Sequence, residues 1–591
     1  MKRVLLVIIV LFSCLGFGQN NIIADDYFKR GEFVKALSLY QKLYESKKSS
    51  NYLYKIAATL QQLERYQEAQ ELLFQKKEKS KSPVLSIEIG YNYRLQDSLT
   101  KADYYFNDAL DYIEEKSHYA YSVARKFEEH SLQDYAIKAY TKGMELQPDK
   151  NYNIQLARIY GDQGNIELMF SSYIDYLENK PSFLNNAKRA FSDFVSENSD
   201  NESNIALRRL LIQKLQLSPE TYWYELLSWL YVQEKAFNKS FVQEKALYMR
   251  NPESLDRIIE LAVAALDQKE YETSERIFSY VLENSQDIST LLTAHQYSID
   301  IKTETYSEKD YGEIDKVYNQ LFETFGTYRQ TLSLQLSYGN FLAFYLKKPE
   351  EGSAFLKQTL DLAISPFQEA SVKLKLADIL VFQEKFNEAL IYYTQIQANL
   401  KNSTIAQEAR FKVAKTSYYK GDFDWAESQL KILKASTSQL IANDALDLKL
   451  LISDNKQEDS LRTALKLYAK ADLMAYQNNS KSAIDALEQI LTEHKGESIT
   501  DQALYKQAKL FEKEGKYENA AANYQQIIAD YREDILADDA HYYLAELYNN
   551  ILGKPEDAKP LYEKIIFEHE DSIYFVEARK AYRKLRGDAI N

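Results

Sequence analysis

The sequence predicts an all-α protein built as a solenoid of stacked helix pairs, and three observations support this. Its 591 residues include only 16 Gly and 9 Pro, too few for the many tight turns of an all-β or α/β protein. The chain is also several times longer than one hydrophobic core usually serves. Finally, one pattern of turn and apolar residues recurs about every 34 residues, as expected of a repeat array.

Composition narrows the possible partners. Hydrophobic residues make up 45% of the chain and charged residues 27%, so extensive disorder is not expected. The formal net charge is −14, and removal of an N-terminal segment with Lys2 and Arg3 would make it more negative by two charges. A chain with this negative charge is not expected to bind nucleic acid.

The first 18 residues have the organisation of a signal peptide. Lys2 and Arg3 precede the apolar run from Val4 to Phe12, and Gly16 and Gly18 supply small residues for cleavage. The sequence therefore predicts residues 1–18 to be a signal peptide and the protein to be exported. No later apolar run of 18 residues occurs in the sequence, so no transmembrane helix is expected.

Two processing routes remain open. Cleavage after Gly18 would release a soluble chain that begins at Gln19, and the sequence favours this route. Alternatively, Leu11-Phe12-Ser13-Cys14 resembles a lipoprotein box in which Cys14 would be lipidated, although Phe12 fits that pattern poorly. Cys14 is the only cysteine, so no disulfide is expected within the chain.

Prolines mark regular helix ends. Pro148, Pro181, Pro219 and Pro252 are separated by 33, 38 and 33 residues. Because proline cannot continue a helix, each interval should hold two helices of about a dozen residues.

A single residue pattern lies between these breaks. Gly515 would end a first helix, Tyr517 would fill the corner, and Ala520 would allow the second helix to approach closely. Tyr524 lies one turn further along the same face. The same positions recur at Gly421, Phe423, Ala426 and Leu430; at Gly31, Phe33, Ala36 and Tyr40; and around Tyr66, Ala102, Ala136, Tyr271 and Phe386.

This pattern resembles the tetratricopeptide repeat, a 34-residue helix-turn-helix. The openings Asp501–Tyr505 and Ala537–Tyr542 look like repeats of bacterial outer-membrane assembly lipoproteins and cell-division coordinators. The resemblance implies a Gram-negative envelope protein, in the periplasm or at the periphery of the outer membrane.

The likeness is uneven along the chain. Residues 182–218, 300–365 and 435–465 keep helical periodicity without the signature positions, so they are either divergent repeats or seams. Residues 301–314 are expected to contain a longer loop. The predicted organisation is 1–18 signal peptide, 19–181 N-terminal repeats, 182–365 divergent helical repeats, 366–453 repeats, 454–571 C-terminal repeats, and 572–591 capping helix and tail.

The chain lacks the sequence signs of catalysis. Its six His residues are scattered, and no phosphate-binding loop, nucleophile elbow or zinc-type H-E-x-x-H motif occurs. We therefore expect no enzyme activity, no cofactor and no metal, although an enzyme hidden within 182–365 is a minor alternative.

In the family that the repeats resemble, the first helix of each pair lines a concave protein-binding surface. This implies binding positions that carry aromatic rings beside charges, a combination suited to an extended peptide or a partner helix. The candidates are Tyr54, Tyr91, Arg94, Tyr121, Arg125, Arg158, Phe411, Lys415, Tyr418, Tyr419, Tyr505 and Lys509, with Asp378 on the same face. With 48 Tyr in the chain, many of these rings could instead fill gaps between repeats.

The favoured function is an exported, non-enzymatic scaffold that binds other proteins in an envelope complex. The alternative is a lipid-anchored component of outer-membrane protein assembly that contacts substrates or a barrel partner. In both readings the chain meets a membrane only through a lipid anchor or a partner.

Overall fold

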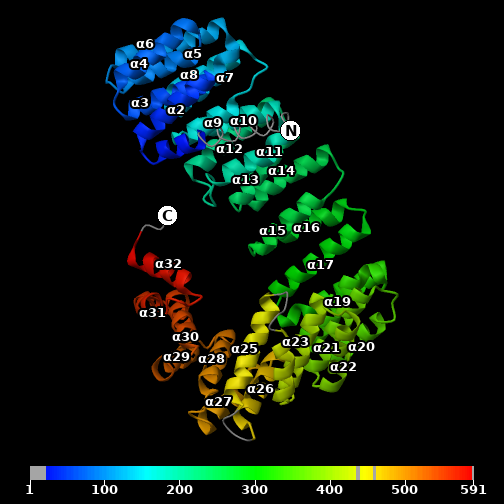
Figure 1. Cartoon of the computed structure of the whole chain (residues 1–591). Helices are drawn as coiled ribbons and strands as arrows, with labels where there is room; N and C mark the ends of the chain where they lie inside the picture. Colours follow the sequence, from blue (N-terminus) through cyan, green and yellow to red (C-terminus); the bar gives the residue numbers. More distant parts are fainter. Residues whose placement is uncertain (1–20, 434–438, 457–460, 589–591) are drawn as a thin grey trace, which may run out of the picture. The chain divides into compact units, whose positions relative to one another are not determined.

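The computed structural model describes residues 21–433, 439–456 and 461–588. Within these ranges the chain is helical and contains no β-strand (Figure 1), which confirms the predicted all-α solenoid. Residues 1–18 and Cys14 lie outside the described residues, so the signal peptide and the lipidation site remain predictions.

The chain divides into two compact units, residues 1–277 and 278–591. The division falls within α16 (Tyr271–Asn284) and within the segment 182–365 that the sequence marks as divergent. The helices of the first unit are α2 (Phe33–Lys47), α3 (Ser50–Gln62), α4 (Tyr66–Lys79), α5 (Pro83–Arg94), α6 (Leu99–Glu115), α7 (Ala120–Glu129), α8 (Gln133–Leu146), α9 (Asn153–Asp162), α10 (Ile166–Asn179), α11 (Leu184–Ser192), α12 (Glu202–Leu217), α13 (Thr221–Gln233), α14 (Phe237–Arg250) and α15 (Asp256–Asp267).

The second unit continues the helical series. Its helices are α17 (Ile288–Thr305), α18 (Tyr311–Phe325), α19 (Leu332–Phe344), α20 (Pro349–Thr359), α21 (Pro366–Phe382), α22 (Phe386–Asn399), α23 (Thr404–Tyr419), α24 (Phe423–Leu433), α25 (Gln439–Asn455), α26 (Thr463–Tyr476), α27 (Ser480–Glu493), α28 (Thr500–Lys513), α29 (Tyr517–Asp530), α30 (Ala537–Glu546), α31 (Pro555–Glu568) and α32 (Phe575–Arg586). Among the described residues, four short 3-10 turns, two in each unit, and one π turn (Leu547–Ile551) occur between or at the ends of helices.

The turn inside most helix pairs uses a left-handed residue. Gly515 has φ 70°, and Lys516 reaches back to donate its backbone N–H to the Phe511 carbonyl at 2.8 Å. This backbone bond satisfies a carbonyl that the helix end would leave unpaired. Other pairs place a residue with a side chain at the equivalent position, such as Lys269 with φ 61°.

Alanines and aromatic residues hold the pairs together, as the sequence pattern predicts. Ala520 and Tyr524 on α29 are fully buried, and Ala426 and Leu430 occupy the equivalent core positions on α24. The small alanine lets the axes approach, while the large residue one turn later fills the space beside the next pair. Each repeat therefore buries its apolar stripe against its neighbours.

The expectation of a longer loop within residues 301–314 is wrong. Helix α17 continues to Thr305 and α18 begins at Tyr311, with a short 3-10 turn at Glu308–Asp310 between them. Thr303 and Thr305 bond their hydroxyls to the carbonyls of Ile299 and Ile301, both at 2.8 Å. Such bonds to the preceding turn let threonine lie inside a helix.

Candidate functional site

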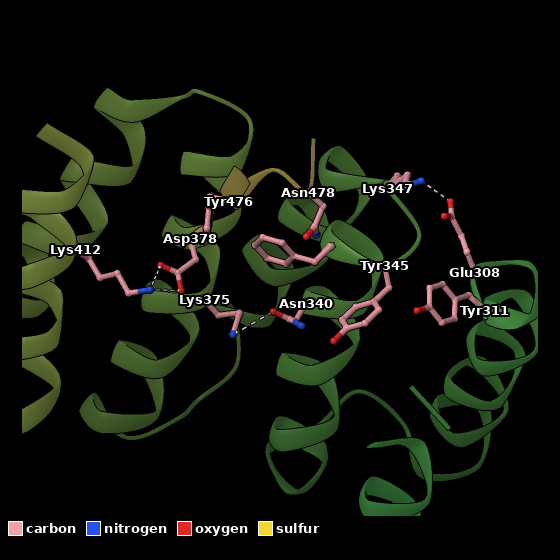
Figure 2. Close-up of a pocket in the computed structure, with 11 residues that line it drawn as sticks. Glu308, Tyr311, Asn340, Tyr345, Lys347, Lys375, Asp378, Lys412, Tyr476 and Asn478 are labelled. Carbon is pink, nitrogen blue, oxygen red and sulfur yellow. Dashed lines mark hydrogen bonds and ion pairs between the residues drawn. The ribbon is translucent and has the colours of Figure 1, made fainter. Parts of the chain in front are cut away.

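The second unit contains a pocket of about 590 Å³ with lysines in its wall. It lies where α18, α19, α21, α23 and the end of α26 meet (Figure 2). The lining side chains combine charges, amides and aromatic rings: Glu308, Tyr311, Asn340, Phe344, Tyr345, Lys347, Lys375, Asp378, Lys412, Tyr476 and Asn478. We call this cavity the lysine pocket.

Two of its three lysines are neutralised by carboxylates. Lys412 lies 3.0 Å from the nearest carboxylate oxygen of Asp378, which also accepts a 2.6 Å hydrogen bond from the Tyr393 hydroxyl. Lys347 pairs with Glu308. The ammonium groups of Lys412 and Lys347 are thus already engaged within the chain.

Lys375 is different, because its recorded partner is a neutral amide. Its Nζ donates to Asn340 Oδ1 at 3.2 Å, and Figure 2 shows the two side chains pointing toward one another across the pocket. Within the described part of the chain, Lys375 has no carboxylate at ion-pair distance. A half-buried cation with only an amide partner favours an incoming anionic group.

One wall of the pocket comes from far along the sequence. The Tyr476 hydroxyl at the end of α26 donates to the Asp378 carbonyl at 3.1 Å, and Gln477 Nε2 donates to the Phe382 carbonyl at 3.0 Å. The Tyr476 ring meets Phe344 edge-on, with centroids 5.8 Å apart. Helix α26 therefore packs across α19, α21 and α23 instead of stacking only on its sequence neighbours.

A buried carboxylate anchors this arrangement. Asp472 on α26 lies 2.7 Å from Lys415 on α23 and 2.6 Å from Lys506 on α28. Burial alone would raise the pKa of Asp472, but the two ammonium groups lower it to about 2. The carboxylate is thus ionised at neutral pH and ties three helices together.

The four candidates on α23 take part in this internal contact. Burial contradicts the prediction of a partner-facing position for Tyr418, whereas a partner-binding role for Phe411, Lys415 and Tyr419 stays a prediction. Tyr418 is fully buried and cannot touch another protein in this structure. Lys415 is engaged by Asp472, and the Tyr419 ring stacks on Tyr476 with centroids 6.3 Å apart. Phe411 is partly buried against the same core. The physical reason is that α26 covers the face that a regular array would leave open.

The six candidates in the first unit lie on consecutive first helices, α3, α5, α7 and α9. Tyr91 stacks on His130 with centroids 3.9 Å apart, and the ammonium of Lys126 lies 5.0 Å from the centroid of Tyr54. Lys126 and His130 both reach the buried carboxylate of Glu88, at 3.1 and 3.3 Å. The aromatic rings here are part of an internal charge cluster.

The other candidates of this unit are more accessible. Arg125 and Arg158 both pair with Glu128, at 3.3 and 2.6 Å, and Arg94 and Tyr121 are exposed. A partner-binding role for these four residues stays a prediction.

Tyr505 and Lys509 on α28 belong to a tyrosine cluster. The Lys509 ammonium lies 2.9 Å from the ring centroid of Tyr543, and 5.7 and 5.8 Å from those of Tyr505 and Tyr524. Burial lowers the pKa of Lys509, against the opposite effect of Glu512 at 3.4 Å. The rings hold a lysine of the chain itself, so this cluster contributes to packing between repeats.

Sequence reasoning missed the lysine pocket except for Asp378. Lys375 lies three positions before Asp378 on the same helix and shares its face, so the local signal was available for this residue. Asn340 and Lys347 lie in a segment without signature residues. Asn478 lines the pocket only because α26 packs against helices distant in the sequence. No local pattern could have grouped them.

Comparison with known proteins identifies two repeats. The model of the tetratricopeptide repeat family matches residues 502–534 and 539–572, which correspond to α28 with α29 and α30 with α31. Proteins with these repeats generally mediate interactions between proteins. No curated protein sequence matches the chain.

Several solved structures are similar to the chain. Yeast Tom70 shares 13% identity with a TM-score of 0.29, covering 86% of this chain and 96% of the other. PilW, a type IV pilus biogenesis factor, shares 14% with a TM-score of 0.27, covering 42% of this chain and 97% of the other. The Cut9–Hcn1 hetero-tetramer of APC/C shares 13% with a TM-score of 0.24, covering 96% of both chains. No statement about partners follows from these likenesses.

In the described residues, no group of three or more His, Cys, Asp or Glu is arranged to hold a metal ion. Nor does any described helix combine the length and apolar character that crossing a bilayer requires.

Proposed function

We propose that the chain is a non-enzymatic scaffold, exported to the envelope of a Gram-negative bacterium, that binds an acidic segment of another protein in the lysine pocket. The observation that carries the binding proposal is Lys375, a cation in a pocket of about 590 Å³ whose recorded partner is the amide of Asn340. The pocket is large enough for one or two side chains of an extended segment.

The leader sequence supports export, and the tandem repeats at 502–534 and 539–572 support a role in protein binding. The sequence Leu11–Cys14 supports the alternative, a lipid-anchored component of outer-membrane protein assembly. The mass of the mature N-terminus separates the two: a free Gln19 supports the soluble scaffold, and a diacylglyceryl Cys14 supports the anchored form.

The binding proposal is tested by affinity capture of the tagged full chain from solubilised bacterial envelopes, followed by quantitative mass spectrometry. Lys375→Gln should lose the captured partner, because the amide keeps the size of the side chain without its charge. Lys316→Gln is the matched control, since Lys316 is exposed on α18 outside the pocket. Equal capture by both variants and the unaltered chain would refute the role of the pocket.

A further inference from the structure

A second cavity of the same unit, about 620 Å³ in volume, lies between α17 and the beginning of α19. Its lining includes Leu292, Gln296, Tyr297, Asp300, Ser333 and Leu334, and no lysine or arginine is among the residues that line it. We call it the acceptor pocket. Its chemistry is the reverse of the lysine pocket, where the ammonium group of Lys375 is not paired with a carboxylate of the described residues.

The hydrogen bonds of Gln296 fix the orientation of its side-chain amide. Its Nε2 donates to Asp300 Oδ1 and to Ser337 Oγ, both at 2.9 Å. A carboxylate only accepts hydrogen bonds, so the amide nitrogen must face Asp300. Gln296 Oε1 is then left buried without a hydrogen-bond partner in the structure, although buried polar atoms are usually paired.

The acceptor groups are held in place by the helices behind them. Ser337 on α19 also shares a 2.7 Å hydrogen bond with the hydroxyl of Tyr318 on α18. The side chains of Gln296 and Asp300 are thus linked through Ser337 to a buried tyrosine. Partial desolvation raises the pKa of Asp300, against the opposite effect of its hydrogen bond from Gln296. Within the described residues, no lysine or arginine lies at ion-pair distance from this carboxylate.

The rest of the wall suits the stem of a long side chain. Leu292, Leu334 and the ring of Tyr297 supply apolar surface beside the carboxylate. Lysine and arginine have this combination of an apolar stem and a cationic head. A cation entering here would meet the carboxylate of Asp300, which the amide of Gln296 holds in place.

Helix α19 connects the two pockets. Its accessible residues Ser333, Ser337, Asn340 and Phe344 recur at intervals of four, three and four, so they share one face. Ser333 lines the acceptor pocket, whereas Asn340 and Phe344 line the lysine pocket. Lys375 bonds to Asn340, which lies seven residues after Ser333. At a helical rise of 1.5 Å per residue, these two positions lie about 10 Å apart, which roughly three extended residues can span.

We propose that the acceptor pocket is a binding site for a lysine or arginine side chain of the same partner segment whose acidic group enters the lysine pocket. The proposal rests on the protein-binding function proposed above. The partner is then recognised by a basic and an acidic residue separated by about three positions, lying along the accessible face of α19. Selectivity comes from two sites of opposite charge at a fixed separation.

The test uses fluorescein-labelled peptides and the purified full chain, with binding followed by fluorescence anisotropy. Each peptide carries one arginine and a pair of glutamates with two Ser/Gly residues between them, in both sequence orders. One matched peptide has citrulline in place of arginine, and another has glutamines in place of the glutamates. Each replacement keeps the shape of the side chain and removes its charge. The unaltered chain should bind the arginine peptide roughly tenfold more tightly, as expected for one charge-assisted hydrogen-bonded pair.

Asp300→Asn should abolish this preference for arginine over citrulline and leave the preference for glutamate over glutamine intact. Lys375→Gln should do the opposite, so failure of either pocket can be recognised separately. Ser333→Arg is a second variant that places the chain's own cation at the mouth and should also abolish the preference. The proposal would be overturned if the unaltered chain bound the arginine peptide no more tightly than the citrulline peptide. It would also be overturned if Asp300→Asn and Ser333→Arg both kept the preference for arginine.

Discussion

The carboxylate of Asp472 provides the sharpest test of how α26 is held in place. Asp472→Asn keeps the shape of the side chain but removes the charge that faces Lys415 at 2.7 Å and Lys506 at 2.6 Å. Two partly buried ammonium groups would then lose their partner. We expect the unfolding free energy of the second unit to fall by about 2–4 kcal/mol.

The magnitude follows from the pKa of the group. Lowering the pKa of Asp472 from 3.8 to about 2 means that folding favours the ionised form, by about 2.5 kcal/mol at 1.36 kcal/mol for each pH unit. Because the folded pKa is lowered, this stabilisation is present above pH 4. It is lost as the pH falls from about 4 to about 2.

The assay is urea unfolding followed by circular dichroism at pH 7 and at several values down to pH 2. Asp447→Asn is the matched control, because Asp447 lies on the exposed side of α25 and forms no ion pair within the described residues. Slight desolvation and the neighbouring carboxylate of Asp444 raise its pKa. Neutralising Asp447 should leave stability unchanged or slightly higher. Equal unfolding midpoints for Asp472→Asn and the unaltered chain at pH 7 would refute the proposed anchor.

Two further predictions concern glycine positions. Gly352→Ala should lower the free energy of unfolding by about 1–3 kcal/mol, because a Cβ at Gly352 would lie 2.7 Å from the backbone carbonyl oxygen of Gly339. The control is Gly312→Ala, whose Cβ would meet nothing within 4 Å. Equal melting temperatures for the two variants would contradict this packing. Lys269→Gly should raise the free energy of unfolding by about 1 kcal/mol, because Lys269 is exposed with φ 61°, whereas Gly515→Ala, at φ 70°, should lower it. Thermal unfolding measures both changes, and a lower melting temperature for Lys269→Gly would contradict the assignment of strain at this position.

Some features of this protein follow from the sequence alone, because they depend on residues close together in the chain. The glycine, corner aromatic and alanine of each repeat lie within a few positions of one another, and they fix the turn and the approach of its two helices. Gly515, Ala520 and Tyr524 lie where this local rule places them. The all-α class and the repeated helix pairs were therefore predictable.

The site depended on tertiary structure. Tyr476 and Asp378 are 98 positions apart, yet they form a hydrogen bond that closes the lysine pocket. The same packing buries Tyr418, which a regular array would leave accessible. The periodicity of apolar residues predicts which face of a helix is apolar but not which helix covers that face. The covering helix is determined by contacts between helices distant in the sequence, such as those of Asp472.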